Sequence, residues 1–316
     1  MAKHPLATII NFCSNEAPFL KPCLKEALKF SQKVYVVVAD RFFDGVEEDM
    51  ALLTDFFSTY SRVQFLLYPY MPVTMNQKNN KVYQQVGEAN FWHSLSRLIG
   101  FSLLDPSIEY TLFLDVDEIA DGNLFQRWLD TREYQKYTAL RPANYWYFRE
   151  SCYQAEKLED SAVLIQNQKT DLSSLLKKSE REALFEDAQE LKIRNVLFEN
   201  KPLIHHYSWV RTKEQMFKKI RSWGHKNDRP WAALIEKEFS SDFKGKDFVH
   251  GYNFEKVKPF CKIDLAQNFL KVQKPGTGSN PNPSLNYIQK IPANVHFLSI
   301  KEVLSLVKKS SKVFTV

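Results

Sequence analysis

The sequence predicts an α/β protein built on a largely parallel sheet, and three short apolar runs carry this prediction. Residues 7–13 (ATIINFC), 34–39 (VYVVVA) and 110–114 (YTLFL) are almost wholly apolar, as is typical of strands that helices cover on both faces. Between the first two runs, the leucines of residues 20–28 recur at helical spacing. This strand, helix and strand form a βαβ unit, whose crossover requires parallel strands.

The remaining elements are predicted from hydrophobic periodicity and from the residues that typically begin or end helices and strands. A polar stretch at residues 69–89 shows little periodicity, and loops of this length are usually functional or mobile. We expect the segment at residues 171–191 to be an inserted surface helix, because it is highly charged and has only a modest apolar stripe. Further helices are expected at residues 47–60, 91–102, 124–129, 212–223, 228–239 and 299–309, and further strands at 63–68, 137–152, 161–166, 196–198 and 202–206.

We expect one domain over residues 1–240 and a C-terminal extension over residues 241–316. The extension contains a Pro/Gly/Asn/Ser linker at residues 274–284 and a terminal helix opened by a capping box of Ser299 and Glu302. We expect this tail and the 69–89 stretch to cover a site rather than to form core. The basic terminal helix could instead dock as plain structure or rest on an anionic membrane.

Composition limits the classes of function. The chain has 316 residues, 44% of them hydrophobic, and a net charge of +6, which favours anionic partners such as nucleotides, acidic glycans or phospholipid headgroups. No motif supports nucleic-acid binding. The four cysteines lie far apart without CxxC spacing, as in a reducing compartment. Without a signal-like start or about 18 consecutive apolar residues, a cytoplasmic protein is expected, with peripheral contact at the inner face of a membrane left open.

An acidic motif follows the third apolar run. Asp115, Asp117 and Glu118 stand at its carboxyl end, where ligands collect in open α/β sheets. Strand geometry puts Asp115 and Asp117 on the same side. Three carboxylates in four residues repel one another unless a cation is present, and hard oxygen ligands suit Mg²⁺ or Mn²⁺. The alternative is a solvated acidic turn after a core strand.

Other polar residues end neighbouring strands. Asn15 and Glu16 follow the first strand, Asp40 ends the second, and His205 and His206 lie in a later one. A neutral imidazole can bind a metal or contact a phosphate. Because adjacent residues on a strand point to opposite faces, at most one of the two histidines can serve a site. We favour His205 for that role, while Asp40 could alternatively be a helix-capping or turn residue.

These strand ends together resemble the GT-A nucleotide-sugar glycosyltransferases, most closely the family-2-like and family-92-like branches. The resemblance covers about residues 7–225 and rests on the Asn15-Glu16 pair after the first strand, the aspartate after the second, and DVDEI at residues 115–119 in place of the family's DxDE motif. The sequence departs from the family after the second strand, where only residues 40–45 (DRFFDG) stand for the usual Asp-Asp-Gly-Ser-Thr-Asp.

The resemblance implies a GT-A-like, Rossmann-type mixed sheet and a metal-dependent transfer, expected to be inverting, from a nucleoside-diphosphate sugar to a glycan or glycolipid hydroxyl. A UDP-sugar is the commoner donor, and Mn²⁺ or Mg²⁺ would stabilise the departing diphosphate as a Lewis acid. The implied roles are metal binding by Asp117 and His205, donor binding by Asn15, Glu16, Asp40, Arg97, Asp115 and His225, and general-base catalysis by Glu150, Glu159 or Asp160. The aromatic residues 145–148 could stack on sugar rings or simply form sheet core.

Two other functions compete with this one. A haloacid-dehalogenase-type phosphatase also uses a strand that ends in Asp-x-Asp, but there the motif normally opens the domain and a later acidic pair completes the Mg²⁺ site. A catalytically inactive GT-A domain acting as a binding module is the other alternative. The retention of three acids together with the downstream histidines favours an active enzyme.

Overall fold

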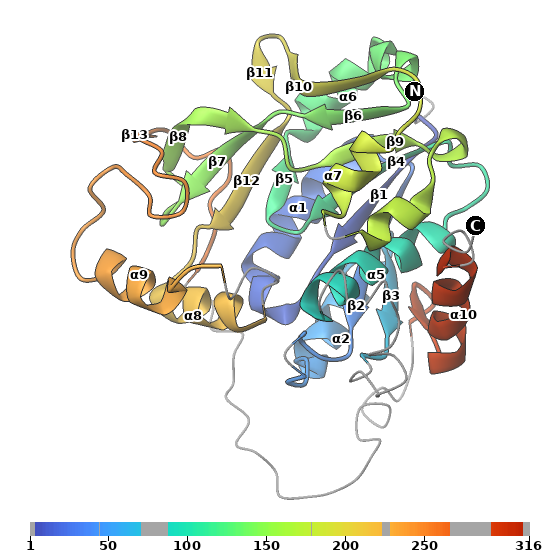
Figure 1. The fold of residues 1–316 in the computed structure, drawn as a ribbon, viewed down its shortest axis with the longest axis horizontal. Helices are drawn as coiled ribbons and strands as arrows, with labels where there is room; N and C mark the ends of the chain where they lie inside the picture. Colours follow the sequence, from blue (N-terminus) through green and yellow to red (C-terminus); the bar gives the residue numbers. More distant parts are fainter. Residues whose placement is uncertain are drawn as a thin grey trace, which may run out of the picture.

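The computed structural model describes residues 4–43, 45–70, 88–177, 179–222, 228–265 and 292–311. Within these residues the chain forms a nine-stranded and a five-stranded sheet with helices packed around them (Figure 1). The predicted α/β class, with a mixed sheet flanked by helices, is therefore confirmed.

The larger sheet has the order β11-β10-β6-β9-β4-β1-β2-β3-β14. Its parallel part runs from β4 through β1, β2 and β3 to β14, whereas β9 is antiparallel to both of its neighbours. The strands are β1 (Leu6–Asn11), β2 (Lys33–Ala39), β3 (Gln64–Tyr68), β4 (Tyr110–Asp115), β6 (Ala139–Pro142), β9 (Val163–Gln166), β10 (Lys192–Phe198), β11 (Lys201–Pro202) and β14 (Val295–Phe297).

The smaller sheet has the order β13-β8-β7-β12-β5 and lies beside the first. Its strands are β5 (Glu118–Ala120), β7 (Asn144–Phe148), β8 (Tyr153–Glu159), β12 (Ile204–Trp209) and β13 (Phe254–Lys256). The chain passes directly from β4 into β5 through Val116 and Asp117, so the acidic motif stands where the two sheets meet.

Helices cover both faces of the larger sheet, because its strands are apolar on both sides. On one face, Ile10, Val36 and Leu112 pack against α1 and its neighbours; on the other, Ile9 and Phe113 pack against α5. The helices are α1 (Ala17–Phe30), α2 (Met50–Thr59), α5 (Glu88–Ser102), α6 (Gly122–Asp130), α7 (Arg181–Glu186), α8 (Lys213–Ser222), α9 (Trp231–Glu238) and α10 (Ile300–Ser311). Short 3-10 turns, among them η1 (Ser14–Glu16) and η4 (Leu172–Leu176), link these elements.

The expected helix at residues 171–191 is wrong in both length and location. The segment folds as η4 and the six-residue α7, separated by a turn in which Glu180 has a φ of 43°. Leu176 and Leu184 are almost completely buried against the α5 face. The leucines and alanines of this segment do not form one long amphipathic stripe, but Leu176 and Leu184 suffice to hold two short turns on the sheet.

The C-terminal segment belongs to the core. Strand β14 pairs in parallel with β3 and extends the larger sheet, and α10 packs beside α5 with Val303 fully buried (Figure 1). The expectation that the tail covers a site rather than forming core is therefore wrong for residues 292–311, and the alternative, that the terminal helix docks as plain structure, is confirmed. The 274–284 linker and most of the 69–89 stretch lie outside the described residues.

None of the helices in the described part of the chain is both long enough and apolar enough to cross a membrane.

Candidate functional site

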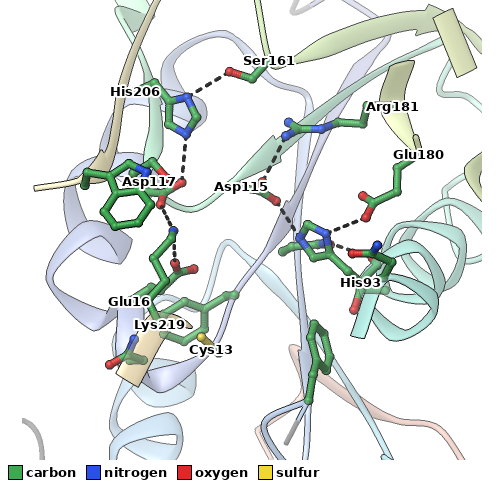
Figure 2. Close-up of a pocket in the computed structure, with 18 of the residues that line it drawn as sticks. Cys13, Glu16, His93, Asp115, Asp117, Ser161, Glu180, Arg181, His206 and Lys219 are labelled. Atoms are coloured by element: carbon green, nitrogen blue, oxygen red, sulfur yellow. Dashed lines mark hydrogen bonds and ion pairs between the residues drawn. The ribbon is translucent and has the colours of Figure 1, made fainter. Parts of the chain in front are cut away.

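A pocket of about 470 Å³ opens at the carboxyl ends of the parallel strands β1, β2 and β4. The strand ends and α5 line one side of it, while β7, β12 and α8 line the other. The charged side chains in Figure 2 fall into two groups, one around Asp117 and one around Asp115. The pocket thus lies beyond the carboxyl ends of the strands, where ligands bind in open α/β sheets.

Asp117 is the most deeply buried carboxylate of the first group, with only 2% of its surface exposed. One of its oxygens accepts hydrogen bonds from Arg211 (2.9 Å) and Lys219 (3.3 Å). The other oxygen lies 3.6 Å from Nε2 of His206. Burial alone would raise the pKa of Asp117, but the three cationic neighbours outweigh it and hold the pKa below its ordinary value.

Glu16 joins the same group from η1. Its carboxylate accepts a hydrogen bond from Arg211 (2.7 Å) and lies 3.6 Å from the Lys219 ammonium. Burial and the nearby Asp117 raise the pKa of Glu16. The Arg211 side chain is 1% exposed, lies over the ring of Phe19 and also donates to a backbone carbonyl. Arg211 is therefore an internal support, whereas Lys219 reaches the pocket.

His206, and not His205, faces the pocket. Nδ1 of His206 lies 2.9 Å from Ser161 Oγ, and its ring meets Trp146 edge-on. His205 points to the opposite side of β12, where its Nδ1 lies 2.8 Å from the Tyr147 hydroxyl and its ring stacks on Phe260. Burial lowers the pKa of His205 to about 4. The preference for His205 is therefore corrected; strand alternation alone does not indicate which face of β12 meets the site.

The second group ties Asp115 to three cations. Its carboxylate accepts hydrogen bonds from Arg97 (2.7 Å) and Arg181 (3.0 Å) and contacts Nε2 of His93 at 3.2 Å. Arg181 also donates to Glu118 at 2.6 Å. The pKa of Asp115 lies well below its ordinary value, because the cations overcome the effect of burial.

Glu180 completes this second group from the turn before α7. Its carboxylate binds both His93 (3.0 Å) and Arg97. Burial and Arg97 would lower the pKa of His93, but Glu180 and Asp115 raise it to about 9. The expected donor role of Arg97 does not fit this geometry, because its side chain is 1% exposed and is committed to two carboxylates. Besides the acidic motif, the only sequence signal for this group is the spacing of His93 and Arg97, which lie four residues apart on one helix.

The other expected donor-binding residues are distributed unevenly. Asn15 lines the pocket. Asp40 does not line it; instead its carboxylate accepts the backbone N–H of Tyr70 at 2.7 Å, the turn role considered as its alternative. His225 lies outside the described residues. Glu48, which the sequence did not single out, is a buried carboxylate at the β2 end of the pocket.

Of the three expected general bases, none lines the main pocket. Glu150 contacts the Cys152 thiol on an exposed turn. Glu159 and Asp160 line a second cavity of about 450 Å³, which shares Arg141, Ser161 and Glu182 with the main pocket. Asp160 is bound there by two hydrogen bonds from Arg194, while Glu159 lies 3.6 Å from Nδ1 of His250, a residue of the main pocket.

The side chains around Asp117 do not fit a divalent ion. Within the described residues, no three histidine, cysteine or acidic side chains converge as a metal-binding set. One oxygen of Asp117 is bound by two cations, and both oxygens of Asp115 are bound by cations. A metal ion needs those same lone pairs and would be repelled by the guanidinium and ammonium groups that already hold them.

No protein-family profile and no curated protein matches the sequence. Among solved structures, the chain is similar to 4-diphosphocytidyl-2C-methyl-D-erythritol synthase from Anaerococcus prevotii, with 12% identity over 67% of this chain and 93% of that one and a TM-score of 0.39. It is also similar to the glycosyltransferase GlyE of Streptococcus pneumoniae, with 12% identity over 76% of this chain and 64% of that one and a TM-score of 0.36. A protein from Mycobacterium sp. strain JC1 shows 10% identity over 64% and 90% of the two chains, with a TM-score of 0.33. Similarity this distant assigns neither family nor activity.

Proposed function

We propose that the protein is a glycosyltransferase that uses a nucleoside-diphosphate sugar as donor. The observation that carries this proposal is the convergence of Glu16, Asp117, His206 and Lys219 from four separate segments of the chain around one pocket at the carboxyl ends of β1 and β4. Such a pocket matches the switch-point crevice in which α/β proteins bind nucleotides. Its volume of 470 Å³ lies within the range of small-molecule sites.

The two halves of the pocket suit the two halves of such a donor. At the β2 end, Phe42 and Phe43 offer apolar surface and Glu48 offers a polar group for a nucleoside, and Asn11 at the end of the neighbouring β1 offers another. At the β12 end, Lys219 and other basic side chains offer positive charge for phosphates. A flat apolar region followed by a cationic one is the order of groups in a nucleoside diphosphate.

The acceptor would enter from the side of Trp146 and the second cavity. Trp146 is packed edge-on between His206 and His250, so one indole edge borders the pocket. Of the three expected bases, we retain Glu159, because it lies next to His250 and Asp160 is held by arginine. In this proposal Glu159, directly or through His250, takes the proton from the acceptor hydroxyl.

A catalytically inactive binding module is the second candidate. The observation that favours it is the neutralisation of Asp115 and Glu118 by Arg181, which leaves the first aspartate of the motif committed to the protein. The same contacts count against a haloacid-dehalogenase-type phosphatase. That chemistry needs an aspartate free to attack phosphorus, and both Asp115 oxygens are bound.

The test is donor hydrolysis and nucleotide binding with a panel of UDP-, GDP-, CDP- and TDP-sugars, in the presence and absence of Mn²⁺. Slow hydrolysis of one donor class supports the transferase, because water replaces the acceptor. Tight binding without turnover, with or without candidate acceptors, supports the inactive module. If no nucleoside diphosphate or sugar nucleotide binds, the proposal fails. An Asp117→Asn variant, which keeps the side-chain shape, serves as the control: hydrolysis by a contaminating enzyme would be the same in this variant as in the wild type.

A further inference from the structure

We propose that Lys219, supported by Arg211, holds the donor diphosphate and neutralises its charge as it leaves, in place of a divalent ion. This inference rests on the proposed function and adds to it a substrate contact and a metal-free mode of leaving-group stabilisation. It reverses the expectation from the sequence that Mn²⁺ or Mg²⁺ would sit at Asp117.

The first support is the way in which charge is balanced around the acidic motif. The five carboxylates Glu16, Asp115, Asp117, Glu118 and Glu180 meet the four permanent cations Arg97, Arg181, Arg211 and Lys219, each within an ion pair. His93 and His206 also contact these carboxylates. The repulsion between acids that suggested a metal is therefore already relieved by side chains.

The second support is the position of Lys219 relative to Arg211. Both side chains bind the same oxygen of Asp117 and the same oxygen of Glu16. Arg211 is enclosed by Phe19 and a backbone carbonyl, but the Lys219 side chain keeps 13% of its surface exposed and lines the pocket. Arg211 thus pairs with Glu16 and Asp117 on the side away from the pocket. The ammonium of Lys219 can therefore turn towards an incoming phosphate without leaving these two carboxylates unpaired.

The third support is that α8 presents Lys219 from fixed backbone. The helix begins with a capping box in which Thr212 and Gln215 exchange hydrogen bonds (2.9 and 3.3 Å), and Met216 anchors it in the aromatic core of the smaller sheet. A lysine on an anchored helix is a preorganised charge, which is worth more to a developing anion than a mobile one.

The chemical step needs no other reagent. The bond between the anomeric carbon and the β-phosphate oxygen breaks, and its electron pair stays on that oxygen. The acceptor hydroxyl oxygen forms the new bond to the anomeric carbon, and its proton passes to the base. Lys219 donates hydrogen bonds to the phosphate throughout and loses no proton, because its task is to lower the energy of the leaving diphosphate as negative charge develops on its β-phosphate.

The experiment compares nucleoside diphosphates with the matching monophosphates by calorimetry, in excess EDTA and in Mn²⁺. Wild-type protein should bind the preferred diphosphate more tightly than the monophosphate, with affinities in EDTA and Mn²⁺ agreeing within about twofold. Lys219→Met should weaken diphosphate binding by about tenfold or more, the usual range for a charge-assisted hydrogen bond, and leave monophosphate binding nearly unchanged. Lys219→Arg should restore the preference for the diphosphate.

The matched control is Lys213→Met. Lys213 lies on the same helix, is 35% exposed and pairs with Glu236 away from the pocket, so its loss should change neither affinity. Unchanged melting temperatures for both variants show that folding is intact.

Three results would overturn the inference. Loss of diphosphate binding in EDTA with recovery in Mn²⁺ establishes a metal site and leaves the proposed function standing. If Lys219→Met keeps the wild-type preference for the diphosphate, the inference also fails and the proposed function also stands. If neither nucleotide form binds under any condition, the proposed function fails and the inference falls with it.

Discussion

Burial and charge act in opposite directions at Asp117. A carboxylate that is 2% exposed loses most of its hydration, which costs several kcal/mol. Arg211 contributes the deepest compensating charge, and it also serves Glu16. The pair of acids is therefore tolerated only as long as this guanidinium is present.

Arg211→Met tests that dependence. Removing the guanidinium deprives the buried carboxylates of Glu16 and Asp117 of a cationic partner. The free energy of unfolding should therefore fall by about 3–5 kcal/mol. Urea denaturation measures this loss. Adding Asp117→Asn to the variant should recover part of the stability, because one buried charge is then gone. A double variant that is less stable than Arg211→Met would contradict this account.

Glu48 gives the fold a pH dependence of known sign. Burial raises the pKa of Glu48 from its ordinary value of 4.5 to about 7, although the backbone N–H groups of Ser14 and Asp49 oppose the shift. Because the pKa of Glu48 is higher in the folded than in the unfolded protein, the protonated carboxyl favours the folded state. This contribution to the free energy of unfolding is fully present below pH 4.5 and is lost as the pH rises through 7.

Glu48→Gln should therefore flatten the pH dependence of stability. Above about pH 8 the variant should be more stable than the wild type by roughly 3 kcal/mol, the free energy that corresponds to the shift in pKa. Near pH 4.5 the two should be nearly equal. Urea midpoints across this range, with Glu47→Gln at an exposed site as the control, provide the measurement. Parallel curves for wild type and Glu48→Gln would remove Glu48 as the source.

Single residues also mark where sequence reasoning ends. The DVDE motif could be placed at a strand end because its neighbours are apolar, and Asp117 does line the pocket. The choice between His205 and His206 depended on which face of β12 lines the pocket, and no local pattern contains that information. Arg181 and Glu180 were missed because a charged, weakly periodic segment resembles solvated surface until its tertiary contacts are known.

Among the elements, the apolar strands and the terminal helix α10 were predictable, but the C-terminal strand β14 was not. The strands β1, β2 and β4 begin and end within two residues of their expected positions, since buried parallel strands have a strong signal. The three residues of β14 are too short to show any periodicity. The capping box of Ser299 and Glu302 did place the start of α10, and its reciprocal hydrogen bonds are present.

The packing of α10 can be tested with two adjacent residues. Val303 is fully buried in the core cluster on the α5 face, whereas Leu304 is 37% exposed. Val303→Ala should cost about 1–2 kcal/mol, because two methyl groups leave a packed site. Leu304→Ala removes more carbon but should change stability by no more than about 0.5 kcal/mol. Thermal or urea unfolding measures both; equal effects would mean that α10 is not docked as described.

Across the whole molecule, sequence reasoning captured the layers and missed the architecture of the cleft. Alternating strands and helices predicted a sheet covered on both faces. The second sheet was not foreseen, because β5, β7 and β12 look like continuations of the first. It is this second sheet that supplies Trp146 and His206 to the pocket, so the site depends on how two sheets are joined.

Ligand binding should report on the molecule as a whole. If the pocket binds a nucleoside diphosphate in the folded state only, a concentration of 100 times Kd adds about 2.7 kcal/mol to the free energy of unfolding. The melting temperature should then rise by several degrees, which differential scanning fluorimetry can detect. The matching nucleoside, which lacks phosphates, should give a much smaller rise at the same concentration. An equal shift with both compounds would contradict a phosphate-binding half of the pocket.

The pairing of β14 with β3 has a consequence for biosynthesis. Phe65 lies opposite Val295, so one side of the sheet's edge is translated long before the other. Closing so large a loop costs entropy before any contact rewards it, and such pairings form slowly. Until β14 docks, the nascent chain carries β3 with a row of unpaired N–H and C=O groups. In a newly made protein, the β3 edge is therefore the place where a chaperone would bind or a second chain would add a strand.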